Sequence, residues 1–163
     1  MRQERFAHVP WAATAARLVL GGVFVVAGVL KVPDPAAAVR AVRAYQLLPE
    51  SLAAPVAFGL PVVEIAVGLA LLAGVFVRTA ALAAAALLVV FLVRVGSAWA
   101  RGLRIDCGCF GGGGEVAAAD TAYPTEVLRD GALLLGALVL ARWPRSRLAL
   151  GGRPLPEEVP SRA

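Results

Sequence analysis

The sequence predicts an all-α integral membrane protein, a four-helix bundle with a short interfacial helix between the first two spans. The 163 residues are 60% hydrophobic and 17% charged, with a mean hydropathy of +0.77. Four apolar stretches approach the roughly 20 residues that a helix needs to cross a hydrocarbon core of about 30 Å. We expect one transmembrane domain, residues 1–147, and a disordered tail, residues 148–163, whose glycines and prolines show no periodicity.

The four spans are expected at about 11–30, 55–77, 79–100 and 127–141. The first run ends at Lys31 and the helix-breaking "VPDP" that follows it. The second run stops at Arg78, so a tight turn around this residue should join it to the third. The fourth run is the shortest and ends in "RWPRSR", whose tryptophan and arginines suit a headgroup layer.

The basic residues predict the topology of the chain. A net charge of +5 does not indicate a nucleic-acid partner, because the arginines flank apolar runs and do not interleave with aromatic residues. One side of the membrane would carry both termini and the 77–79 turn, with few acids and these basic residues: Arg2, Arg5, Arg78, Arg142, Arg145, Arg147 and Arg153. We therefore expect cytoplasmic termini in a multi-pass cell membrane protein. The first run is too long for a cleaved signal peptide.

The segment "PAAAVRAVRAYQLLPE" lies between the first two spans. It places Val39, Val42 and Leu47 on one side, and Arg40 and Arg43 elsewhere. This pattern is typical of a short helix on the outer interface, although a plain connecting loop remains the alternative. In either form the segment would lie over the loop between the third and fourth spans.

That loop, "LRIDCGCFGGGGE", contains both cysteines of the chain, Cys107 and Cys109, and would be extracytoplasmic. Gly108 tolerates the unusual backbone that a disulfide between them needs. Such a bridge closes almost no chain and is strained, which favours thiol–disulfide exchange over a structural role. Three alternatives remain open: inert thiols, two ligands of a metal site, and linkage to a partner's cysteine. A closed zinc site needs four ligands, and the single histidine, His8, is expected at the opposite face.

Charged residues near the cysteines would tune their reactivity in opposite directions. Arg101 and Arg104 favour a thiolate, whereas Asp106 opposes it.

Glu64, in "LPVVEIAVG", lies about 13 Å below the outer end of the second span. A carboxylate at this depth is costly unless it is protonated, paired or hydrated, so Glu64 is a candidate functional residue. Arg17 and Arg94 are the expected partners, and Lys31 is more remote. The alternative to proton handling is a structural ion pair between helices. Small residues would allow close helix packing in the first two spans: Gly21, Gly22, Gly28, Gly59 and Gly68.

Four stretches in this order, "GGVFVVAGVLKV", "YQLLP", "PVVEIAVGLALLAG" and "DCGCFG", resemble the MauE branch of the DoxX-like membrane proteins. The resemblance covers about residues 12–142. It implies a bacterial four-helix membrane protein that is redox-associated, with Cys107 and Cys109 as the redox pair and Glu64 as the membrane carboxylate. For that family it also implies a link to methylamine utilisation and to the maturation of a disulfide-rich dehydrogenase subunit, alongside a thioredoxin-like protein.

The resulting functional hypothesis is thiol–disulfide exchange with an extracytoplasmic thioredoxin-like partner, with electrons passing to a membrane carrier such as a quinone. Glu64 and Asp106 are the candidate proton donors, and the quinone would bind near Phe91, Trp99 or Phe110. One alternative is a non-catalytic membrane subunit or assembly factor that docks a redox enzyme. Another is a small transporter that uses Glu64, for which a homodimer would supply the pathway.

Overall fold

The computed structural model describes residues 4–106, 108, 112–115, 117 and 121–144 of the chain. In chain order these form α1 (Glu4–Lys31), α2 (Pro35–Ala44), α3 (Glu50–Ala73), α4 (Val77–Ala100), β1 (Ile105–Asp106), β2 (Gly114–Glu115) and α5 (Tyr123–Arg142). The expected tail, 148–163, lies outside the described residues.

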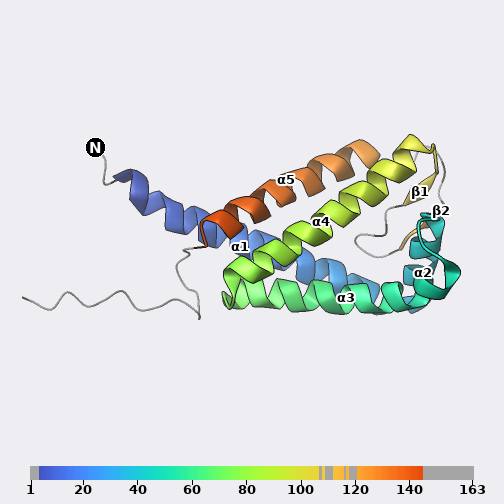
Figure 1. The fold of residues 1–163 in the computed structure, drawn as a ribbon, viewed down its shortest axis with the longest axis horizontal. Helices are drawn as coiled ribbons and strands as arrows, with labels where there is room; N and C mark the ends of the chain where they lie inside the picture. The colour runs from blue at the N-terminus through green and yellow to red at the C-terminus, as the bar shows by residue number, and fades with distance from the viewer. Residues whose placement is uncertain (1–3, 107, 109–111, 116, 118–120, 145–163) are drawn as a thin grey trace, which may run out of the picture.

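The four long helices run along the length of the molecule, and α2 and the β1–β2 pair lie together at one end (Figure 1). We call this the α2 end. The α3–α4 turn and the last residue of α5 lie at the opposite end. Three helical stretches of the described chain are long and apolar enough to cross a membrane: Trp11–Lys31, Glu50–Ala73 and Val77–Ala100.

The fourth expected span corresponds to α5, which is less apolar than the other three. Its 20 residues include Glu126, Arg129, Asp130 and Arg142. Two of these, Glu126 and Asp130, are buried, whereas Leu128 and Leu135 are exposed. α5 therefore turns two acidic residues into the bundle and leucines outward.

The α3–α4 turn differs from the sequence expectation. α3 ends at Ala73 because Gly74 adopts a left-handed conformation (φ 70°), and its N–H bonds back to the carbonyl oxygens of Ala70 and Leu71. The N–H of Val75 also bonds to the Ala70 oxygen at 3.0 Å. The turn therefore occupies residues 74–76, and Arg78 lies inside the first turn of α4. The expectation of a turn around Arg78 is wrong, because Gly74 ends α3 before the chain reaches Arg78.

α1 and α3 pack at very short range. A methyl group on Gly28 would lie 2.6 Å from Ile65 Cγ1 and 2.8 Å from the Pro61 carbonyl oxygen. Gly21 and Gly68 face one another in the same way, and a methyl group on either would lie within 2.9 Å of the other's carbonyl oxygen. Small residues thus let the two backbones meet, as expected. Gly22 and Gly59 have no neighbour at this range, so neither takes part in this contact.

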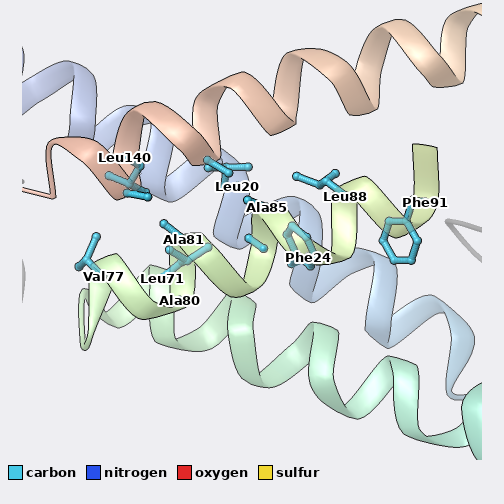
Figure 2. Packing of buried hydrophobic residues seen from close by; sticks show 13 residues of the cluster. Leu20, Phe24, Leu71, Val77, Ala80, Ala81, Ala85, Leu88, Phe91 and Leu140 are labelled. Atoms are coloured by element: carbon cyan, nitrogen blue, oxygen red, sulfur yellow. The ribbon is translucent and has the colours of Figure 1, made fainter. Parts of the chain in front are cut away.

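The main apolar core lies among α1, α3, α4 and α5. Leu20 and Phe24 of α1, alanines of α4 and Leu140 of α5 belong to one cluster of buried side chains (Figure 2). Two alanines of α4 are completely buried there, Ala81 and Ala84, and such small side chains allow the helices to approach closely.

α2 is a helix, which is one of the two alternatives that the sequence left open. Asp34 caps its first turn by accepting a hydrogen bond from the Ala37 N–H at 2.8 Å. Ala37 and Ala41 of α2, and Tyr45 directly after it, are buried against the rest of the protein. Small side chains face the bundle because α2 lies directly against the glycine-rich loop, where a larger residue does not fit.

Candidate functional site

Glu64 is completely buried in the middle of α3, and its partner is Lys31 at the end of α1. The Lys31 ammonium nitrogen lies 2.5 Å from Oε1 and 2.8 Å from Oε2 of Glu64. The lysine side chain is only 9% exposed. One ammonium group therefore binds both carboxylate oxygens, which is the satisfied form of a buried charge pair.

This pairing corrects the expectation that Arg17 or Arg94 would bind Glu64. In an α-helix the Cα–Cβ bond tilts toward the N-terminus. α1 and α3 are antiparallel, so Lys31 extends back into the bundle while Glu64 extends toward the α2 end, and the two side chains approach one another. Arg17, on α1, tilts away from Glu64 toward the opposite end and is itself buried. The direction in which each side chain extends, more than its depth along the helix axis, therefore decides which residue pairs with Glu64.

Arg94 belongs to an aromatic cluster beside the ion pair. Its guanidinium carbon lies 4.2 Å from the centre of the Tyr45 ring and 5.8 Å from that of Phe91. The Lys31 nitrogen lies 5.6 Å from the centre of the same Phe91 ring. Phe91 therefore lies within cation–π distance of both cations near the buried carboxylate.

Asp130 is a second buried carboxylate that the sequence analysis did not identify. It lies on α5, is 3% exposed, and accepts a hydrogen bond from Arg129 Nε to Oδ1 at 2.9 Å. Its Oδ2 atom is buried and has no hydrogen-bond partner in the structure. Asp130 and Glu64 line the same cavity of about 20 Å³, which is large enough for one water molecule.

The signal for Asp130 was present in the sequence. Glu126 and Asp130 are four residues apart at the start of an apolar run, which places both on one helix face. The reasoning that singled out Glu64 would also have selected Asp130. It did not, because the expected span began at residue 127 and Glu126 was assigned to a loop.

Cys107 and Cys109 lie outside the described residues, as does Phe110, but their neighbours define where the loop sits. β1 and β2 pair antiparallel, with Ile105 opposite Glu115 and Asp106 opposite Gly114. Gly108 is described and buried, has the positive φ expected of it (64°), and donates its N–H to Asp106 Oδ1 at 3.3 Å. Asp106 therefore bonds to the backbone of the residue between the two cysteines.

α2 packs against this loop. A methyl group on Gly108 would lie 3.0 Å from the Ala41 side chain, and one on Gly113 only 2.4 Å from it. Arg101 does not point to the loop. It donates to the carbonyl oxygen of Tyr45, and so ties the end of α4 to the end of α2.

The loop and the ion pair share one small cavity. Its lining includes Gly108, Ala41 of α2, Lys31, and both Phe91 and Arg94 of α4. Gly108 of the cysteine loop and the cationic residues Lys31 and Arg94 thus line the same space. Of the sequence-predicted residues, the structure brings together Gly108, Arg94 and Lys31–Glu64, whereas Arg17 lies deeper among the helices.

The remaining aromatic candidate, Trp99, is half exposed and stacks on Tyr123, with the ring centres 6.4 Å apart. The Tyr123 hydroxyl donates to the Leu103 carbonyl oxygen at 2.7 Å and accepts from the Ile105 N–H at 3.2 Å. Trp99 and Tyr123 therefore support the base of the hairpin. Among the described residues, which exclude both cysteines, no cluster of three or more metal-ligating side chains occurs.

Comparisons with known proteins identify the family of the chain. Residues 9–142 match the family profile described as methylamine utilisation protein MauE. The methylamine utilization protein MauE of Paracoccus denitrificans is 39% identical over 105 residues, which are 64% of this chain and 56% of the relative. The chain thus aligns with just over half the length of that relative. No solved structure matches. With a match that covers all four long helices, the chain is a multi-pass membrane protein that belongs to the MauE family.

Proposed function

We propose that this protein performs thiol–disulfide exchange at the outer surface of a bacterial cell membrane, using Cys107 and Cys109. The observation that carries the proposal is the placement of Gly108, between the two cysteines, in the wall of a cavity that also contains Lys31 and Arg94. The cationic residues would stabilise a thiolate in the loop. The small ring that the two cysteines close would be easily reduced and reoxidised.

In the oxidising direction, a dithiol of a thioredoxin-like partner attacks the Cys107–Cys109 disulfide. The partner leaves as a disulfide, and the two cysteines become thiols. A membrane quinone then accepts two electrons and two protons from these thiols, which reforms the disulfide and yields a quinol. Asp106, next to Cys107, and Glu64 are the candidate groups for moving those protons.

Topology and biological context belong to the same proposal. The excess of arginines on the side of the termini and the 74–76 turn supports cytoplasmic termini and an extracytoplasmic loop. The similarity to a protein named for methylamine utilization supports a role in methylamine utilisation.

The second candidate function is a non-catalytic membrane subunit or assembly factor that docks a redox enzyme. The Lys31–Glu64 pair favours it, because a fully satisfied ion pair between closely packed helices is also what a purely structural role requires.

A redox titration in native membranes separates the two functions. The thiols would be trapped at controlled potentials with a membrane-impermeant maleimide, in wild type and in the Cys107→Ser and Cys109→Ser variants. The exchange proposal expects a reversible two-electron transition, accessible from outside and absent from both variants. Thiols that never change state would favour the docking subunit, and thiols that are labelled only after the membrane is broken would overturn the topology.

A further inference from the structure

A third and larger cavity lies between α2, α3 and α4, apart from the two small cavities described above. Its volume is about 300 Å³. α3 and α4 separate as they run from their shared turn toward the α2 end (Figure 1), and the cavity occupies that part of the molecule. Val56 and Leu60 of α3 form one wall, and Val90, Phe91 and Arg94 of α4 form another.

The cavity opens sideways, toward the surface that faces lipid. Val90 and Val93, which line it, are 52% and 62% exposed. Of the described residues in its lining, only Tyr45 and Arg94 carry polar side chains. A ligand that enters from the bilayer would therefore be largely apolar and would have its polar atoms at the Arg94 end.

Arg94 supplies a specific requirement for that ligand. Its guanidinium group stacks on the faces of Tyr45 and Phe91, which leaves the N–H edge for hydrogen bonds. Among the hydrogen bonds and ion pairs of the described residues, none involves the Arg94 side chain. A guanidinium at this position needs an acceptor oxygen, because an unbonded charge inside a membrane protein is costly.

The depth of Arg94 distinguishes between two ligands that have such an oxygen. Arg94 lies six residues before the end of α4, about 9 Å below that end. A lipid phosphate would have to leave the headgroup layer to reach it. A quinone ring is neutral and resides in the hydrocarbon layer, and its two carbonyl oxygens accept hydrogen bonds while its face stacks on aromatic rings.

The position of the cavity adds a functional reason. Its lining shares Val42, Leu60, Phe91 and Arg94 with the small cavity under Gly108. A ring held by Arg94 would thus lie next to the space beneath the cysteine loop.

We infer that the cavity between α2, α3 and α4 is a quinone-binding site in which Arg94 donates a hydrogen bond to a quinone carbonyl oxygen. The inference rests on the proposed function for its redox role. In that role, the dithiol of Cys107 and Cys109 transfers two electrons and two protons to the bound quinone, and the products are the disulfide and the quinol. Binding itself requires no cysteine.

The test uses the full-length protein in nanodiscs of zwitterionic lipid. A photoreactive azidoquinone would be cross-linked and mapped by peptide mass spectrometry, and decylubiquinone would compete to give a dissociation constant. We expect labelled peptides from the α2, α3 and α4 walls. Arg94→Leu should raise the dissociation constant about tenfold or more, the loss expected for one hydrogen bond to a charged group. Arg94→Lys, which keeps the charge but loses the planar fork, should raise it less.

A steric variant guards against misfolding as the cause. Val56→Trp fills the cavity and should abolish competition, whereas Val62→Trp, on the exposed surface of the same helix, is the matched control and should bind as wild type does. Equal binding by Val56→Trp and Val62→Trp would overturn the site. So would labelling that maps elsewhere, or retention of an anionic lipid by Arg94 that decylubiquinone does not displace.

The Cys107→Ser/Cys109→Ser double variant keeps the two proposals apart. We expect it to bind decylubiquinone with an unchanged dissociation constant. Binding without any oxidation of the wild-type thiols by quinone would support the site and contradict the redox coupling. Thiol exchange with a partner but no quinone binding would overturn the site and leave the exchange function in place.

Discussion

The two sides of α3 are built in opposite ways. On the side of α1, glycines bring the backbones into contact, and a completely buried carboxylate has both oxygens bound by one lysine. On the side of α4, near the α2 end, the helices separate around an apolar cavity lined by Arg94, whose guanidinium group contacts the rings of Tyr45 and Phe91. α3 thus packs closely against α1 and leaves space toward α4. The buried charges Lys31 and Glu64 are paired where the helices touch, whereas Arg94 is available to a ligand where they separate.

The largest effect is expected at the Lys31–Glu64 ion pair, on the side of α3 that packs against α1. Lys31→Leu removes the hydrogen-bonded counter-ion of the buried Glu64, which should destabilise the protein by about 3–5 kcal/mol. The midpoint of unfolding by sodium dodecyl sulfate in mixed micelles measures this. An unchanged midpoint would show that the ion pair does not hold α1 to α3.

The double variant Lys31→Met/Glu64→Leu sharpens the same point. Replacing a whole buried pair with apolar residues is often neutral or stabilising, so this protein should unfold near the wild-type midpoint. If the folded double variant also loses reversible thiol oxidation, then Glu64 has a role in proton handling beyond packing. If it retains that oxidation, the pair is structural.

The next effect concerns the contact between the α1 and α3 backbones. Gly28→Ala places a methyl group 2.8 Å from the Pro61 carbonyl oxygen, so the helices must separate, at a cost of about 1–3 kcal/mol. Gly22→Ala is the matched control, because no atom lies within 4 Å of the added methyl group. Thermal unfolding of both variants in detergent should show a lower midpoint for Gly28→Ala only. Equal midpoints would break the distinction between the two sides of α3.

A smaller effect is expected where α2 covers the cysteine loop. Gly113→Ala forces a residue with a Cβ into φ 99° and against Ala41, whereas Gly102→Ala meets a similar left-handed backbone (φ 65°) without any contact. Each should cost about 1–2 kcal/mol from backbone strain. Only Gly113→Ala should also speed maleimide labelling of the cysteines, because it displaces the loop from α2. Equal labelling rates would show that α2 does not cover the thiols.

The smallest effect is expected at the protein surface, where α2 is linked to the start of α3. Arg43 and Glu50 form an ion pair in which both side chains are more than half exposed. Arg43→Ala should change stability by a few tenths of a kcal/mol, and high salt should abolish the difference. A larger change in the unfolding midpoint would mean that the link between α2 and the start of α3 is part of the packed structure.

Much of the fold was predictable because apolar length and helix breakers are properties of local sequence. Hydropathy located α1, α3 and α4, and the proline-containing break after Lys31 was correct. The turn at 74–76 was misplaced because a single glycine decides where a helix ends within a continuous apolar run. The side of α2 that packs on the protein was not predicted, because the close approach of Gly108 and Gly113 to Ala41 selects small side chains there and hydrophobicity does not.

The site was less predictable, since it depends on directions between helices. Glu64 was identified from its burial cost alone, but the choice of Lys31 required the antiparallel contact of α1 with α3. Asp130 was missed although it lies inside the expected fourth span, because Glu126 was assigned to a loop and the inward-facing pair of acids on one helix face was not recognised. The cavity beside Arg94 follows from the separation of α3 and α4, which no local pattern reports. The state of Cys107 and Cys109 stays a prediction.

Lys31 also constrains how the chain enters the membrane. During synthesis, α1 is inserted before α3 exists, so the amine that later binds Glu64 has no partner at that stage. Its place in the last turn of α1 lets the flexible side chain reach the headgroup layer in the meantime. A lysine in this place therefore suits both the single helix, where its side chain can extend to the headgroups, and the folded bundle, where its amine binds Glu64.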